Sequence, residues 1–303
     1  MAQPITTGSH PKALWPGIHA WWGRQYNEHR EEFPELFDRE TSDKAYEEDV
    51  EITGFGLAPI KPETTGIVYD TENQGAVTRY THVSYALGYI VSYEELRDNL
   101  YEIVSKRRAQ AVAFSMRQTI ENVGANVYNR AFNTGFPIGD GAALGSASHP
   151  TVAGNQSNLL TTAADLSEIA IEDLVIQIMQ TQNARGLRIS NVPQSLHIPP
   201  QLWFEANRVV KSVLQNDTTN NAINVIRATD VFPKGVKVNH YFTSATAWFV
   251  RTNVPRGAQF FEREAPTFDQ DNDFDTKNAK AACYMRLSFN VTDWRQIFMT
   301  PGV

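Results

Sequence analysis

The longest helical pattern of the chain covers residues 92–135. Apolar residues recur in it at spacings of three and four, and no proline interrupts them. Ser92 and Glu95 form a capping box at its start, and Gly135 supplies a residue that can turn left-handed at its end. A helix of this length spans roughly 60 Å, which is more than a compact domain needs. We expect it to brace an extended structure; a coiled-coil arm is the alternative, although no strict heptad is sustained.

Residues 48–91 carry the alternating pattern of strands. Apolar and polar residues alternate over 50–55 and again over 76–83, and turn-forming residues lie between them. The pattern predicts a protruding β-hairpin. Two-stranded ribbons are only marginally stable alone, so this one should lean on another surface, which could belong to another subunit. The side chains expected to make that contact are Ile67, Tyr69 and Tyr80.

Residues 136–254 predict an α/β lobe. Its first part, rich in Gly, Ala, Ser and Asn as far as residue 158, is typical of a surface loop. Apolar periodicity then predicts helices and short strands. The predicted helices are 167–185 and 202–215, and the predicted strands are 196–198, 223–226, 236–242 and 247–250.

The last part, residues 255–303, returns to strand patterns. We expect a strand over 259–264, a solvated acidic loop over 269–275 and a long central strand over 279–291. Cys283 falls on the apolar face of the long strand. This position predicts a small core residue rather than a nucleophile.

The first 47 residues do not look like a domain. They contain several aromatic side chains interleaved with acidic ones, and too few aliphatic residues for a core of their own. An arm that lies on other surfaces fits both facts, and those surfaces could belong to its own chain or to a neighbour. The aromatic residues expected to contact another subunit are Trp15, Trp21, Trp22, Phe33 and Phe37.

Composition narrows the class of protein. The hydrophobic share of 42% and the charged share of 20% are those of a soluble globular protein. The single cysteine excludes a disulfide within the chain and favours an intracellular origin. No apolar run approaches the ~20 residues of a membrane span, and the first residues lack the features of a signal peptide. The net charge of -7 argues against a wholesale nucleic-acid coat, although a local basic patch could touch phosphates.

Candidate chemistry is sparse. His149, followed by a proline, has no His, Cys or Glu at metal-ligand spacing, and we expect its replacement by alanine to be silent. The acidic stretch 269–275 does not fit the twelve-residue calcium loop. Neither a Gly-rich phosphate loop nor a nucleophile elbow is present. We therefore predict no catalytic residue, no cofactor and no metal site, and we do not expect an enzyme.

The order of these elements resembles that of the major capsid proteins of tailed bacteriophages, which have the Hong Kong 97 fold. Local sequence is similar too, and is nearest to Mu-like major head subunits, at 80–89 running into Ser92, at 140–150 and at 293–295. The resemblance implies an α+β fold. Its parts would be an N-terminal arm (1–47), an E-loop hairpin (48–91), the spine helix of the P-domain (92–135), an A-domain (136–254) and the return strands of the P-domain (255–303).

The resemblance also implies a function. The chain would self-assemble through hexamers and pentamers into an icosahedral head shell, assembled in the bacterial host cytoplasm and resident in the virion. Packaged double-stranded DNA would touch the inner face non-specifically, and scaffold, portal and decoration proteins are possible partners; no membrane is involved. An encapsulin-type nanocompartment with the same fold is the alternative.

Overall fold

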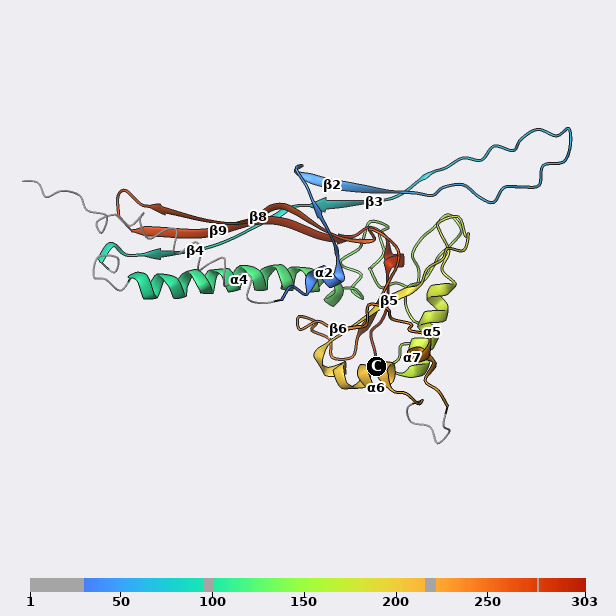
Figure 1. The fold of residues 1–303 in the computed structure, drawn as a ribbon. Coiled ribbons are helices and arrows are strands. Elements are labelled where there is room, and N and C mark those ends of the chain that lie inside the picture. Colours follow the sequence, from blue (N-terminus) through green and yellow to red (C-terminus); the bar gives the residue numbers. More distant parts are fainter. Residues whose placement is uncertain (1–29, 95–100, 216–221, 277) are drawn as a thin grey trace, which may run out of the picture.

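The computed structural model describes residues 30–94, 101–215, 222–276 and 278–303, with only the backbone described for 101–106. A long sheet lies along a long helix, a compact lobe lies at one end of both, and a hairpin projects beyond the lobe (Figure 1). The elements in chain order are α2 (Phe33–Leu36), β1 (Asp38–Thr41), β2 (Tyr46–Ile52), β3 (Gln74–Thr81), β4 (Val83–Val91), α4 (Tyr101–Asn129), α5 (Glu168–Met179), β5 (Pro193–Ile198), η3 (Pro200–Leu202), α6 (Trp203–Lys211), α7 (Val225–Ala228), β6 (Val236–Val238), β7 (Trp248–Thr252), β8 (Ala258–Asn272), β9 (Ala279–Val291), η4 (Trp294–Gln296) and β10 (Ile297–Thr300).

The long sheet has the strand order β1-β8-β9-β4, and β9 is its central long strand. Strict alternation along β9 buries Cys283, Met285 and Leu287, and this face of the sheet packs on α4. The predicted strand over 279–291 and the buried position of Cys283 are both confirmed. Burial raises the pKa of the Cys283 thiol to about 12, which keeps it protonated and unreactive.

The long helix ends earlier than predicted. Its described part, α4, has 29 residues, or roughly 44 Å, and stops at Asn129 rather than at Gly135. The side chain of Asn129 donates to the carbonyl of Tyr241 at 3.0 Å and accepts from the amide of Thr243 at 3.0 Å. The helix end is thus tied to the lobe. The predicted capping residue Glu95 lies outside the described residues.

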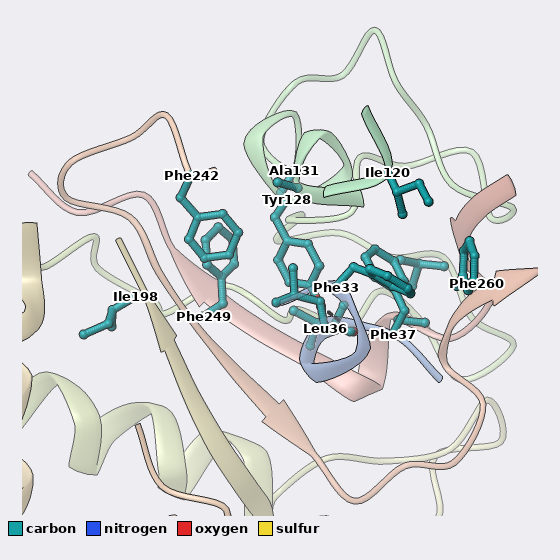
Figure 2. Packing of buried hydrophobic residues seen from close by; sticks show 14 of the residues in the cluster. Phe33, Leu36, Phe37, Ile120, Tyr128, Ala131, Ile198, Phe242, Phe249 and Phe260 are labelled. Atoms are coloured by element: carbon teal, nitrogen blue, oxygen red, sulfur yellow. Dashed lines mark hydrogen bonds between the residues drawn. The ribbon is translucent and has the colours of Figure 1, made fainter. Parts of the chain in front are cut away.

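The second half of the predicted arm packs on its own chain. Phe33 and Phe37 are buried, with ring centroids 4.8 Å from Phe260 and 5.6 Å from Tyr128 respectively (Figure 2). Glu121 of α4 holds α2 in place, because its carboxylate accepts from the backbone amides of Glu32 at 3.0 Å and Phe33 at 2.9 Å. Two of the arm's predicted aromatic contacts are therefore part of the chain's own core.

The acidic residues of this segment also form ion pairs within their own chain. Glu31 pairs with the buried Arg117 at 2.6 Å, and Asp38 pairs with Arg251 at 2.5 Å. Of the two surfaces that the sequence left open for the arm, the described part uses its own chain.

The predicted hairpin is present, but it is shorter at its C-terminal end. Strands β2 and β3 pair in antiparallel register from Tyr46↔Thr81 to Ile52↔Gln74. The rest of the predicted segment, 83–91, is β4, which pairs with β9 in the long sheet. The assignment of residues 48–91 to one hairpin was wrong, because an alternating pattern predicts a strand but does not show which strand it pairs with. His82 alone separates the two strands, and its ring nitrogens lie 3.0 Å from Ser288 Oγ and 3.2 Å from Ser42 Oγ.

The lobe has its own sheet, ordered β10-β7-β5-β6. The last strand of the chain, β10, belongs to it rather than to the return strands. Helices α5 and α6 confirm the two predicted helices, although both end earlier, and Ser167 caps α5 by accepting from the amide of Ala170. The strand predicted over 223–226 was wrong: Asn224 caps a short helix there instead. The prediction of an acidic loop over 269–275 was also wrong in part, since the strand β8 continues to Asn272.

The predicted surface loop after α4 contains a buried polar centre. His149 is fully buried; its Nδ1 lies 2.6 Å from a carboxylate oxygen of Asp140 and its Nε2 lies 3.1 Å from Asn158 Oδ1. Its ring stacks on Trp294 with centroids 4.5 Å apart. The expectation that this histidine lies in a surface loop is therefore wrong, and its contacts give a reason to revise the prediction of a silent replacement by alanine.

We expect His149→Ala to lower the free energy of unfolding by about 2 kcal/mol or more, because a buried hydrogen-bond partner and a stacked ring are both lost. His240→Ala is the matched control, since His240 is largely exposed beside Glu32 and should cost less than about 1 kcal/mol. Urea unfolding followed by circular dichroism measures both. Equal effects of the two substitutions would contradict the buried role of His149.

A second prediction concerns pH. His197 on β5 is buried, and burial, with Arg251 and Lys237 nearby, lowers its pKa to about 3. Below pH 6.5 the unfolded chain binds a proton at this histidine, whereas the folded chain does not until the pH approaches the lowered pKa. The free energy of unfolding therefore falls as the pH drops from 6.5 toward that value. Between pH 6.5 and 5 the residue should remove up to about 1.4 kcal/mol of stability per pH unit. Urea midpoints of the wild type and His197→Gln should diverge over this range, with the variant less sensitive; parallel curves would refute the assignment.

Candidate assembly surface

Exposed apolar side chains gather at the tip of the hairpin, residues 53–73. Ile60 is 95% exposed and Tyr69 is 88% exposed. The two legs of the tip surround an open hollow of about 910 Å³. The tip's large exposed apolar side chains are Phe55, Leu57, Ile60, Ile67, Val68 and Tyr69. Contiguous apolar surface of this kind marks an interaction site in a folded protein.

The tip is held in position at its base. Arg185, in the loop after α5, donates Nε–H to the carbonyl of Gly54 at 3.2 Å and Nη2–H to Asp70 at 3.1 Å and to the carbonyl of Thr71. The backbone amide of Gly56 donates to the second carboxylate oxygen of Asp70 at 2.8 Å. The backbone amide of Thr71 also donates to Asp70, at 2.8 Å, and the amides of Gly56 and Thr71 are the main cause that lowers the pKa of this carboxyl group. Both legs of the tip are therefore attached to the lobe at one point.

A second attachment lies closer to the strands. Arg295 is buried and its guanidinium Nη1 lies 3.2 Å from a carboxylate oxygen of Glu51 on β2. Asp49, also on β2, accepts from the side chains of Gln259 at 2.6 Å and Thr292 at 3.2 Å. The hairpin therefore leaves the body in a fixed direction, and the described part of the chain leaves the apolar side chains of its tip uncovered.

The predicted contact residues divide into three groups. Ile67 and Tyr69 lie exposed on the tip, where they are free to meet another subunit. Tyr80 is buried instead: its ring lies 4.8 Å from that of Phe261 and its hydroxyl 2.6 Å from Thr292 Oγ1. Phe33 and Phe37 are buried in the same way, so these three have no exposed area for a neighbour. Trp15, Trp21 and Trp22 lie outside the described residues.

Two further apolar surfaces are exposed that were not predicted from the sequence. One is the outer side of α5, with Ile169 and Ile176 exposed. The other is β4, on which Val83, Leu87 and Ile90 are exposed. Both surfaces could have been predicted from the sequence. α5 has apolar residues on more than one face, and β4 contains no charged residue.

One pair of side chains has the spacing of a nucleophile and a base. Ser195 Oγ and His197 Nε2 lie 2.8 Å apart, but both residues are buried in the lobe sheet. Within the described ranges, no group of three or more His, Cys, Asp or Glu side chains could hold a metal ion. In the same ranges, no helix combines the length and the hydrophobicity needed to cross a membrane.

Comparisons with known proteins indicate a family and a fold. A model of the phage capsid protein family matches residues 75–299. No curated protein matches the chain. Among solved structures, the virus-like particle from Pyrococcus furiosus matches with a TM-score of 0.53 and 10% identity over 94% of this chain and 98% of that one.

Two further solved structures give similar values. One is from Mycobacterium phage Che8, with a TM-score of 0.52 and 12% identity over 89% of this chain and 92% of that one. The other is a phage-related protein from Bordetella bronchiseptica RB50, with a TM-score of 0.52 and 13% identity over 94% and 96%. At such identities these structures establish a shared fold. Because the family match covers most of the chain, this protein belongs to the phage capsid protein family.

Proposed function

We propose that this chain is the major subunit of an icosahedral phage head shell and that its function is assembly rather than catalysis. The observation that carries the proposal is the hairpin tip, which is apolar, held away from the body and uncovered by the described part of its own chain. In the terms of the Hong Kong 97 fold, β2, β3 and the tip are the E-loop. The helix α4 with the long sheet is the P-domain, and the lobe, completed by β10, is the A-domain. Motifs near residues 80–89 support a Mu-like subgroup.

The reach of the tip supports contact with a neighbour. Each leg of residues 53–73 has about ten residues, which span up to roughly 30 Å when extended. That distance is comparable to the width of a small domain. Figure 1 shows the tip beyond the lobe, far from the long sheet and from α4. Burial of its apolar side chains would therefore occur on a second copy.

We extend the proposal to the partners. Hexamers and pentamers of this chain would form the shell, with the arm, whose residues Trp15, Trp21 and Trp22 lie outside the described ranges, as a further subunit contact. Packaged double-stranded DNA would contact the inner face without sequence preference, and scaffold, portal and decoration proteins would bind the shell. Assembly would take place in the host cytoplasm and the product would be the virion. The support for these partners is membership of the phage capsid protein family.

An encapsulin-type nanocompartment is the second candidate. This candidate is supported by the similarity to the virus-like particle from Pyrococcus furiosus, which extends over 94% of this chain. The family match favours the phage head. The content of the particle separates the two, since a head holds nuclease-protected DNA and a nanocompartment holds protein cargo.

Electron microscopy of the purified protein, alone and with co-expressed phage proteins, tests the proposal. We expect rings or closed shells of uniform size. A strictly monomeric protein at high concentration under all these conditions would contradict it.

Removal of apolar side chains from the tip should block assembly without unfolding the subunit. For Ile67→Ser combined with Tyr69→Ser, we expect shell yield to fall at least about tenfold, because each buried side chain contributes about 1.5–3 kcal/mol at every contact. The melting temperature of the free subunit should stay unchanged, since both residues are exposed in it. Glu63→Gln on the same tip is the control. Normal shell yield from the double variant would mean that the tip contributes nothing to assembly.

The anchor of the tip gives a second prediction. Arg185→Ala removes the bonds to Gly54, Asp70 and Thr71, so residues 53–73 should open locally while the core stays folded. We expect chymotrypsin to cleave the tip several-fold faster in this variant. Arg208→Ala, which breaks an exposed pair with Glu205 on α6, is the matched control. Cleavage at equal rates in both variants would show that Arg185 does not position the tip.

A further inference from the structure

Two arginines of the long sheet have guanidinium groups that the chain does not satisfy. Within the part of the chain that the structure describes, the guanidinium of Arg286 on β9 has no hydrogen-bond or ion-pair partner, and its Nε atom is buried. Arg263 on β8 also has a buried Nε atom without a partner, and its ion pair with the fully exposed Asp43 is long, at 4.0 Å. A buried donor without an acceptor costs free energy, so both side chains are suited to an acceptor from outside the chain.

Both guanidinium groups lie on the face of the sheet that is opposite α4. On β9 the side chains alternate, and Met285 and Leu287 are buried on the α4 side, so Arg286 between them points to the other face. On β8 the residues before and after Arg263 line a cavity of about 60 Å³ together with Met285 and Leu287. The register pairs Glu264 with Arg286, which places the two arginines at adjacent positions of neighbouring strands.

His82, between β3 and β4, lies close to the same two arginines. Its ring Nδ1 is 3.0 Å from the hydroxyl of Ser288, which is two positions beyond Arg286 on β9 and therefore on the same face. Burial lowers the pKa of His82 most, followed by the charge of Arg286; Arg263 lowers it further, and Glu47 raises it. The imidazole therefore stays neutral beside two cationic groups.

The carboxylates of this region are bound by other groups. Glu47 accepts from Ser42 Oγ at 2.8 Å and from Lys44 Nζ at 2.9 Å. Glu262 on β8 pairs with Arg39 of β1. The positive charge of the two sheet arginines is therefore not neutralised by these acids.

A hydroxyl pair adds a neutral donor next to Arg286. Ser84 of β4 is opposite Arg286 in the register, and its Oγ lies 2.8 Å from the hydroxyl oxygen of Tyr284. Only one of these two hydroxyls donates to the other, so the second O–H group remains available for a further acceptor. Guanidinium and hydroxyl donors thus converge on one area of the sheet.

We propose that Arg263 and Arg286 form a binding site for a small phosphate-type oxyanion on this face of the sheet. A guanidinium group presents its N–H donors in a planar fork that matches the oxygens of a phosphate. A polyanion such as DNA fits less well, because the net charge of -7 and the exposed Asp43 would repel its further phosphates. The bound ion would join β8 to β9 at Arg263, where the register between these strands shifts.

Thermal unfolding of the full chain in inorganic phosphate tests the site, with sodium chloride at equal ionic strength as the reference. We expect phosphate to raise the melting temperature in a saturable manner, because it binds the folded chain. Arg286→Gln and Arg263→Gln should each weaken the apparent phosphate affinity at least about tenfold. Arg130→Gln, which removes the same charge from an exposed side chain after α4, is the control and should bind like the wild type.

Without phosphate, the two sheet variants should be at least as stable as the wild type, because each removes one of two like charges and no hydrogen bond. A marked loss of stability there would show that the arginines serve the fold and not a ligand. Equal effects of phosphate and chloride, or unchanged phosphate affinity in both variants, would also overturn the site. Stabilisation through Arg286 by a short DNA duplex, but not by phosphate, would overturn the choice of a small ion.

Discussion

The contact between the apolar face of β9 and the helix α4 is the interaction on which the rest of the structure depends. It joins a strand of 13 residues to a helix of 29, so the core is long and narrow rather than round. A core of this shape cannot enclose every element of the chain. The arm segment with Phe33 and Phe37 packs into one end of it, and the lobe closes the same end through the aromatic cluster around Tyr128 and Phe249 (Figure 2). The hairpin is left outside.

Polar contacts then decide where the hairpin points. Arg295 and Arg185 each bind a carboxylate of the hairpin from the body, and His82 joins its two ends to β9 through Ser42 and Ser288. Burial, with Arg286 nearby, lowers the pKa of His82, so this link is made by a neutral ring. Charged and polar groups of this kind fix direction more than they add stability. The apolar tip is the part of the hairpin that the body leaves uncovered. Because the chain belongs to a family of capsid proteins, we propose that a second copy covers it.

The parts of the fold that a local sequence pattern determines could be predicted from the sequence. The strand over 279–291 and the buried Cys283 followed from strict alternation, and the cap at Ser167 followed from local hydrogen bonding. The exposed position of Ile67 and Tyr69 followed from an apolar run placed between turns. Predictions failed where structure depends on partners distant in sequence. Alternation could not tell that β4 pairs with β9 rather than with the hairpin, nor that Tyr80 is buried against Phe261. The burial of His149 depends on Trp294, which is 145 positions away.

The central claim is that the hairpin tip is completed by a second subunit. A cryo-electron microscopy reconstruction of the assembled particle tests it most directly, because the path of residues 53–73 can be traced in the density. We predict that the tip of each subunit lies on a different subunit, with Ile67 and Tyr69 buried there. A closed shell in which the tip folds back on its own subunit, or extends into solvent without contact, would contradict the account.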